Sequence, residues 1–262
     1  MKFGISTASL FLRKPTEEAL KFLAENNVES CEVFFSTYCE YEKEFAQSLL
    51  SVKKNINVNS MHVLNTQYEP QLYNLNPRAK ADAFKMLEKT TTAGEIIGAK
   101  YYTFHGMARY KVTPIKMDYD RIGSVTQEVI EVCKKHGITL SYENVHWSYY
   151  NYIGFFTEIK KRCPELKGVL DIKQAWQNKI HYGEFIKEMN SDIVTVHVSD
   201  VDENGKIVLP GKGNFNFNEM FLRLKDVGFN GTVLIEVYKD SYQNESELFE
   251  SLNFLKTAYQ KA

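Results

Sequence analysis

Six acidic or imidazole residues stand at the ends of short apolar runs, and their types are those that bind metals and move protons. They are His62, His105, Glu143, Asp171, His197 and Glu236. A carboxylate that closes a buried strand is costly unless a partner neutralises it. Three carboxylates and three imidazoles brought together need a positive charge, because unpaired acids repel one another and are forced to protonate. The pattern predicts a divalent metal ion, and mixed oxygen and nitrogen ligands suit Mn, Co, Mg or Zn.

The elements that would position these residues repeat along the chain as a β-branched or aromatic run followed by a segment with helical spacing. Eight runs are predicted as strands: 2–7, 30–35, 57–63, 99–106, 139–145, 168–172, 192–200 and 231–238. Helix signals separate them, such as Asn76 before Pro77 as cap and first-turn proline, and His136 before Gly137 as a C-terminal stop. Further helices are expected to begin near Thr16, to end near Cys163, and to cover 41–55, 181–189, 218–228 and 246–261.

Eight alternating units without a linker-like break favour one α/β domain over residues 1–262, folded as a (β/α)8 TIM barrel. An open doubly wound sheet shows the same alternation but has no need of eight units. In a TIM barrel the active site lies at the C-terminal ends of the strands, which is where the six residues fall.

Strand alternation predicts which neighbours share the barrel interior. If the six residues point inward, those two positions earlier point inward too. These are Ser60, Thr103, Ser141, Val169, Thr195 and Leu234, all compact enough for a crowded interior. Tyr102, Tyr142, Ile235 and Val237 should face the helices instead.

A single His or Glu at a strand end is more often a satisfied polar residue than a ligand. Six at the same level in six consecutive strands favour a functional site. The other histidines are expected elsewhere: His136 as a helix cap, His181 on a helix surface and His146 in the loop after Glu143.

Composition narrows the function classes. The 32 basic and 33 acidic residues are interspersed and give a net charge of −1, so attraction to nucleic acid or an anionic membrane is not expected. The four cysteines form no C-x-x-C pair, which suits reduced, buried thiols. No apolar run is long enough to span a bilayer, the N-terminus makes a poor signal peptide, and we expect a cytoplasmic protein. A homo-oligomer is left open.

Five motifs together resemble the xylose-isomerase-like barrel superfamily, in particular its sugar phosphate isomerase/epimerase group, which includes ketose 3-epimerases and endonuclease-IV-like enzymes (AP endonuclease family 2). They are "SYENV", "LDIKQA", "VHVSD", "LPGKGNFNF" and "VLIEVY", and the resemblance covers nearly the whole chain. It implies that Glu143, Asp171, His197 and Glu236 hold one metal ion. It also implies that Glu143 and Glu236 act as acid and base on opposite faces of a sugar, a sugar phosphate or a related polyhydroxy ketone. Such chemistry is plausible, because a metal that bridges carbonyl and hydroxyl oxygens acidifies the C–H bond between them.

Residues near the four implied metal ligands distinguish the endonuclease-IV-like enzymes from the ketose 3-epimerases. Endonuclease-IV-like enzymes carry a His three positions after the strand-six Asp, where this chain has Gln174, and no histidine follows His197. Their third zinc site therefore cannot form in the same way, which counts against phosphodiester cleavage. Ketose 3-epimerases place an Arg six residues after the strand-seven His, and this chain has Glu203 there. The identity of the sugar is thus left open.

Six residues are assigned to substrate contact: His62, His105, Gln174, Lys173, Arg109 and Lys212. His62 and His105 match positions that hold another zinc ion in the nucleases, so a second metal is the alternative for them. Lys173, Arg109 and Lys212 are expected as surface or loop charges within reach of an anionic group. Three other functions compete with a metal-dependent isomerase or epimerase: a zinc phosphoesterase, an inosose-type dehydratase and a non-catalytic sugar-binding barrel.

Overall fold

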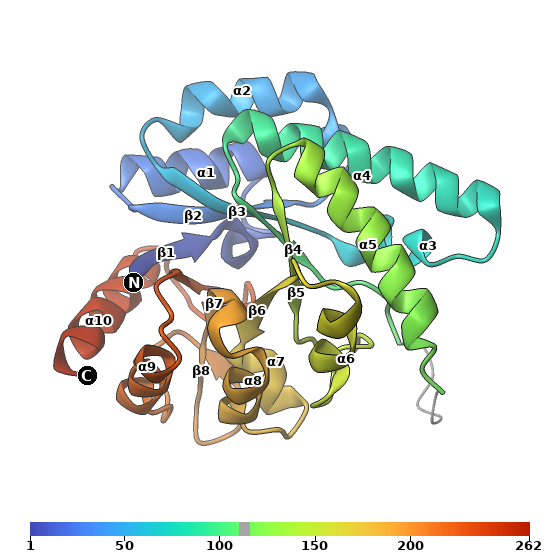
Figure 1. The fold of residues 1–262 in the computed structure, drawn as a ribbon. Helices are drawn as coiled ribbons and strands as arrows, with labels where there is room; N and C mark the ends of the chain where they lie inside the picture. The colour runs from blue at the N-terminus through green and yellow to red at the C-terminus, as the bar shows by residue number, and fades with distance from the viewer. Residues whose placement is uncertain (110–115) are drawn as a thin grey trace.

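The computed structural model describes residues 1–109 and 116–262, and eight parallel strands close into a barrel (Figure 1). The strands are β1 (Lys2–Ser6), β2 (Ser30–Phe35), β3 (Asn57–Val63), β4 (Tyr101–Phe104), β5 (Thr139–Glu143), β6 (Lys167–Asp171), β7 (Ile193–Val198) and β10 (Thr232–Ile235). Each strand pairs in parallel with its neighbours in the chain, and β1 pairs with β10 to close the ring. The predicted (β/α)8 TIM barrel is confirmed.

Eight of the described helices surround the barrel and match the predicted ones in order. They are α1 (Thr16–Glu25), α2 (Lys43–Lys53), α4 (Pro77–Ile97), α5 (Tyr119–Lys135), α6 (Phe155–Arg162), α8 (Tyr182–Met189), α9 (Phe217–Asp226) and α10 (Glu247–Lys261). Two short helices were not predicted, α3 (Glu69–Leu72) and α7 (Ile172–Gln177). A small hairpin, β8 (Asp200–Val201) with β9 (Ile207–Val208), follows β7, so the predicted seventh strand ends two residues early.

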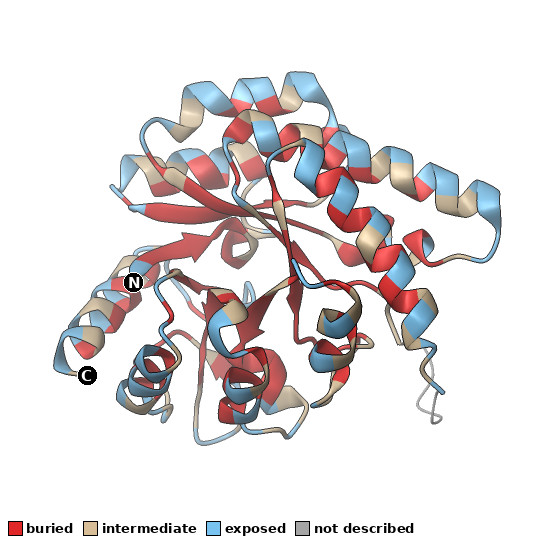
Figure 2. Ribbon diagram, in the orientation of Figure 1, coloured by how far each residue is buried: buried red, intermediate tan, exposed pale blue. Residues whose placement is uncertain are grey.

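Burial follows the layers of the fold. The strands are buried along most of their length, whereas each outer helix buries one face and exposes the other (Figure 2). In α8 the buried Tyr182, Phe185, Ile186 and Met189 recur at helical spacing, which places one apolar stripe against the barrel. Among residues 1–109 and 116–262, no helix is long and apolar enough to cross a membrane.

Two helix ends form as the sequence predicts. The Asn76 side chain accepts a hydrogen bond from the backbone N–H of Arg78, directly before Pro77. Gly137 follows the last turn of α5 with φ of +67°, a conformation that glycine adopts without steric cost. Asn76 thus determines where α4 begins, and Gly137 determines where α5 ends and the chain turns into β5.

The barrel interior confirms the predicted alternation and adds one irregularity. Ser60 and Thr103 point inward, and Tyr102 points outward, where its hydroxyl donates to Glu69 of α3. Between β2 and β3 the register skips one residue, so that Asn59 bulges. Asn59 donates to Thr195 Oγ1 at 2.9 Å and thereby links β3 to β7 across the interior. Polar side chains therefore fill the middle of the barrel as hydrogen-bonded pairs.

Gly4 in β1 provides a test of how tightly β1 and β2 pack. A Cβ atom added at Gly4 would overlap the backbone carbonyl of Ser30, which cannot move without breaking the barrel pairing. We predict that Gly4→Ala lowers the free energy of unfolding by about 1–3 kcal/mol or more, measured by urea denaturation.

Gly98→Ala is the matched control for this substitution. Its Cβ would meet no atom within 4 Å, although Gly98 has φ of +80°. The control should therefore lose only the backbone strain, about 1 kcal/mol. Equal losses in the two variants would contradict the packing that we describe.

Candidate active site

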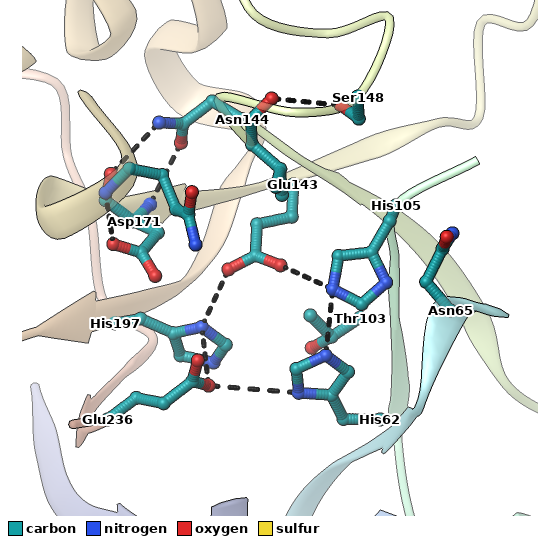
Figure 3. Close-up of polar contacts among 12 residues, drawn as sticks. His62, Asn65, Thr103, His105, Glu143, Asn144, Ser148, Asp171, His197 and Glu236 are labelled. Atoms are coloured by element: carbon teal, nitrogen blue, oxygen red, sulfur yellow. Dashed lines mark hydrogen bonds and ion pairs between the residues drawn. The ribbon is translucent and has the colours of Figure 1, made fainter. Parts of the chain in front are cut away.

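The six residues predicted from the strand ends meet at the C-terminal end of the barrel, and all six are buried. His62, Glu143, Asp171 and His197 lie in the last two positions of β3, β5, β6 and β7, whereas His105 and Glu236 follow β4 and β10 by one residue. Figure 3 shows their side chains converging from these separate strands. The barrel therefore assembles one polar cluster from residues that are far apart in the sequence.

Four of these residues form a group with the dimensions of a metal site. Glu143, Asp171, His197 and Glu236 each offer one ligand atom, and these atoms lie within 4.8 Å of one another. The Nδ1 atom of His197 lies 2.9 Å from a Glu143 oxygen and 3.1 Å from Glu236 Oε2. Asp171 Oδ2 and Glu236 Oε2 are buried, and among the described residues their closest contacts are ion pairs, at 3.1 Å to Lys173 Nζ and to His197 Nδ1, rather than hydrogen bonds. This donor set fits a divalent cation.

The local structure around Asp171 aims one of its oxygens at the group. Asp171 caps the short helix α7, because its Oδ1 accepts the backbone N–H of Gln174 at 2.9 Å. Asn144 pairs with the Asp171 backbone through both its amide atoms, at 2.9 and 2.8 Å (Figure 3). The helix cap uses Oδ1 and the Asn144 pairing holds the backbone, so that Oδ2 remains for the ion pair with Lys173 and for the group formed with Glu143, His197 and Glu236.

His62 and His105 form a second pair beside the group. Their Nε2 atoms lie 2.9 Å apart, and His105 Nε2 also lies 3.2 Å from a Glu143 oxygen. His105 Nδ1 lies 3.2 Å from Glu69, so both of its ring nitrogens face carboxylates. Burial alone would lower the pKa of His105, but Glu69 and Glu143 raise it to about 10. His62, His105 and Glu143 also lie close enough together to hold an ion.

The pKa values in the cluster are determined by burial and by the opposite charges that lie next to each carboxyl group. Burial raises the pKa of Asp171 to about 6, against the pull of the Lys173 ammonium. Burial acts in the same direction on Glu143, yet the hydrogen bonds from His105 and His197 hold the pKa of its carboxyl well below the usual range. Glu143 is therefore ionised at neutral pH.

Lys173 was expected to be a surface or loop charge, and this prediction was wrong. Its side chain is buried, and Nζ lies 3.1 Å from Asp171 Oδ2 and 3.2 Å from Glu236 Oε1. Burial would lower the pKa of Lys173, but these two acids raise it well above the usual value. The ammonium thus compensates part of the negative charge that the barrel collects.

A cavity of about 440 Å³ opens above the cluster. Its walls include the aromatic side chains of Phe11, Phe34, Trp147 and Tyr238. Polar groups that line it are His62, His105, Arg109, Lys173, Gln174 and Glu236. Apolar walls with a few convergent polar groups are typical of a site for a small molecule.

Two of the predicted substrate contacts have other partners in the structure. Gln174 lines the cavity, but its side-chain oxygen also accepts the backbone N–H of His146 and ties the loop after β5 to α7. Lys212 is exposed, lies 3.9 Å from Glu250 of α10 and is not among the residues that line this cavity. The neighbouring N–H groups of Gly211 and Gly213 donate to Asp200, so they are not presented to an anion.

Two buried acids of the site were missed by the sequence analysis. Glu32 lies inside β2 and contacts both His62 and His197, and its signal was an acid in the middle of the apolar run "SCEVFF". Burial would raise the pKa of Glu32, but the two imidazoles hold it well below the usual range. Glu69 lies in the polar segment before α4, where an acidic residue is ordinary, so nothing in the sequence indicates that it is buried.

The comparisons with known proteins agree with this geometry. A model of the xylose isomerase-like TIM barrel family matches residues 20–258. A D-tagatose 3-epimerase-like protein superimposes with a TM-score of 0.82 at 19% identity, covering 100% of this chain and 98% of its own. D-psicose 3-epimerase from Clostridium cellulolyticum H10 gives 0.78 at 16% identity, with 99% of each chain covered.

A third similar structure is that of the IOLI protein with a bound zinc atom, with a TM-score of 0.77 at 16% identity and coverage of 100% and 97%. At such identities the structural likeness shows the shared fold. The match of the family model, in contrast, extends over most of the sequence, including β2 to β10 and the residues of the cluster. The chain therefore belongs to the xylose isomerase-like TIM barrel family.

Proposed function

We propose that this protein is a divalent-metal-dependent isomerase or epimerase of a small polyhydroxy ketone, and that it works by proton transfer next to the carbonyl. One observation carries the proposal. Carboxylates of Glu143 and Glu236 approach the same nitrogen, His197 Nδ1, at 2.9 and 3.1 Å. They come from β5 and from the residue after β10, strands that are separated in the barrel by β6 and β7.

Such a pair of carboxylates matches the needs of epimerisation. One removes a proton from carbon on one face of the substrate, and the other returns a proton to the opposite face. Glu143 is ionised because His105 and His197 hold the pKa of its carboxyl well below the usual range, so it is in the deprotonated form that a base requires. A bound divalent ion supplies polarisation of the carbonyl and charge stabilisation of the enediolate. Glu143, Asp171, His197 and Glu236 would hold that ion.

The remaining polar groups of the cavity would bind and orient the substrate. Lys173 places a buried ammonium beside Glu236, where it can donate to a substrate oxygen that gains negative charge. His62, His105 and Gln174 line the same cavity and can hydrogen-bond to hydroxyl groups, and Arg109 can contact an anionic group. The aromatic walls place apolar surface next to the polar groups of the cavity, as is typical of a site for a small molecule. The names of the similar solved structures, two of them 3-epimerases or 3-epimerase-like, support a sugar as substrate.

The zinc phosphoesterase is kept as a second candidate because of one observation. Glu143 belongs both to the four-residue group and to the group with His62 and His105, so two ions could share it. The balanced charge of the chain, with a net charge of −1, gives no general attraction to a nucleic acid backbone. The number of metal ions distinguishes the two candidates.

We predict that protein stripped with a chelator and then dialysed against Mn, Co, Mg or Zn salts binds one ion per chain, measured by elemental mass spectrometry. Asp171→Asn should bind the ion much more weakly, because it loses a charged ligand while the amide oxygen still caps α7. No ion with any of the four metals would contradict the proposal. Two zinc ions per chain would favour the phosphoesterase.

We also predict that the metal-loaded protein exchanges a C–H proton of a ketose with deuterated water, followed by NMR over a panel of ketoses and ketose phosphates. Glu143→Gln should slow this exchange by about two to four orders of magnitude, because it removes a base and a ligand charge. Gln174→Ala is the control on the cavity wall and should lose less than about tenfold, since it removes one neutral contact. Exchange in Glu143→Gln at the wild-type rate would contradict the mechanism, and binding without any exchange would indicate a non-catalytic barrel.

A further inference from the structure

Glu32 occupies the interior of the barrel under the candidate metal group. It is the third residue of β2, its side chain is fully buried, and it is not among the residues that line the cavity. The carboxylate of Glu32 contacts side chains from four other strands: β1, β3, β4 and β7.

Three hydroxyl groups fix the position of this carboxylate. Ser6 donates to Oε1 at 3.0 Å, and Ser60 and Thr103 donate to Oε2 at 2.8 and 2.6 Å. An ionised carboxylate accepts hydrogen bonds and cannot donate them. With these three donors in place, Oε2 already accepts two hydrogen bonds and Oε1 accepts one, and the remaining capacity of the carboxylate is shared by two imidazoles.

The two imidazoles that use this capacity come from opposite sides of the barrel. His62 Nδ1 lies 3.1 Å from Oε1, and His197 Nε2 lies 3.3 Å from the carboxylate. A neutral imidazole has one N–H and one lone pair, so the nitrogen that donates determines which nitrogen can bind a metal. In a neutral His197 ring, donation from Nε2 to Glu32 would leave the lone pair on Nδ1 for a metal ion, in place of the proton that Nδ1 otherwise donates to Glu143.

We infer that Glu32 is a positioning residue that sets the tautomer and ring orientation of His197, and so presents Nδ1 of His197 to the metal ion. The same carboxylate holds His62 by Nδ1 and leaves Nε2 of His62 directed at His105. Partners of this kind raise the affinity of a site for its metal by about ten- to a hundredfold. The inference rests on the proposed metal site, and its test distinguishes a failure of the role of Glu32 from a failure of the metal site itself.

Glu69 provides a matched control for Glu32. It too is a fully buried glutamate that faces an imidazole and accepts from a buried hydroxyl, here His105 and Tyr102. Within the described residues, Glu69 makes no hydrogen bond or ion pair with Glu143, Asp171, His197 or Glu236, whereas Glu32 contacts His197 directly. Loss of either carboxylate should cost stability, but only loss of Glu32 should release a metal ligand from its orientation.

The experiment compares zinc binding by wild type, Glu32→Gln and Glu69→Gln with isothermal titration calorimetry, and their thermal unfolding without metal. We expect the dissociation constant of Glu32→Gln to rise about ten- to a hundredfold and that of Glu69→Gln to rise clearly less at a comparable loss of melting temperature, because Glu69 reaches the metal group only through His105. Wild-type zinc affinity in Glu32→Gln, or an equal loss in both variants, would overturn the inference. If wild type itself bound no zinc or other divalent ion, the proposed metal site would fail first.

A second measurement needs no variant and so does not depend on how Glu32→Gln folds. The chain has six histidines, which keeps a long-range 1H–15N spectrum of the zinc-loaded wild type sparse. We expect the His197 ring to carry its proton on Nε2 and the metal on Nδ1. A proton on Nδ1, with the metal on Nε2, would overturn the role of Glu32.

Discussion

The structure depends on keeping four carboxylates buried at one end of the barrel. These carboxylates belong to groups whose ligand atoms lie within 4.8 Å of one another, and each is at most 9% exposed. They are Glu32, Glu143, Asp171 and Glu236. Burying ionised acids together is unfavourable unless positive charge or N–H donors compensate them. Here three imidazoles, the Lys173 ammonium and the backbone N–H of Gln174 do so in part. The ligand atoms of Glu143, Asp171, His197 and Glu236 nevertheless lie within 4.8 Å of one another, and this gathering of three carboxylates around one imidazole is the physical reason for assigning a cation to the site.

The barrel makes this arrangement attainable because six strands, β3 to β7 and β10, each bring one residue to the same end. Parallel pairing sets Asp171 beside His197, and His197 beside Leu234, two residues before Glu236. Below this level, Ser6, Ser60 and Thr103 hold Glu32 in a layer of hydrogen-bonded side chains. A rigid polar layer thus supports the side chains that would bind metal and substrate, as a preorganised site requires.

The fold and the converging residues were predictable because both follow from local rules. Strand runs, helix ends and the two-residue period together place His62, Glu143 and Asp171 at one end of a barrel. Lys173 was not predictable as a buried residue, because its burial depends on long-range contact with Asp171 and Glu236. The burial of Glu69 was not predictable either, because the polar segment around it does not indicate that it packs against His105. Glu32 could have been found, because an acid inside an apolar strand needs partners in the interior.

The most direct test of a cation held by the buried carboxylates is anomalous diffraction from crystals of the protein soaked in Mn²⁺. We expect one anomalous peak, at manganese–ligand bond distances from oxygen atoms of Glu143, Asp171 and Glu236 and from Nδ1 of His197. The absence of a peak at this position, or a single peak between His62 and His105 instead, would contradict this assignment.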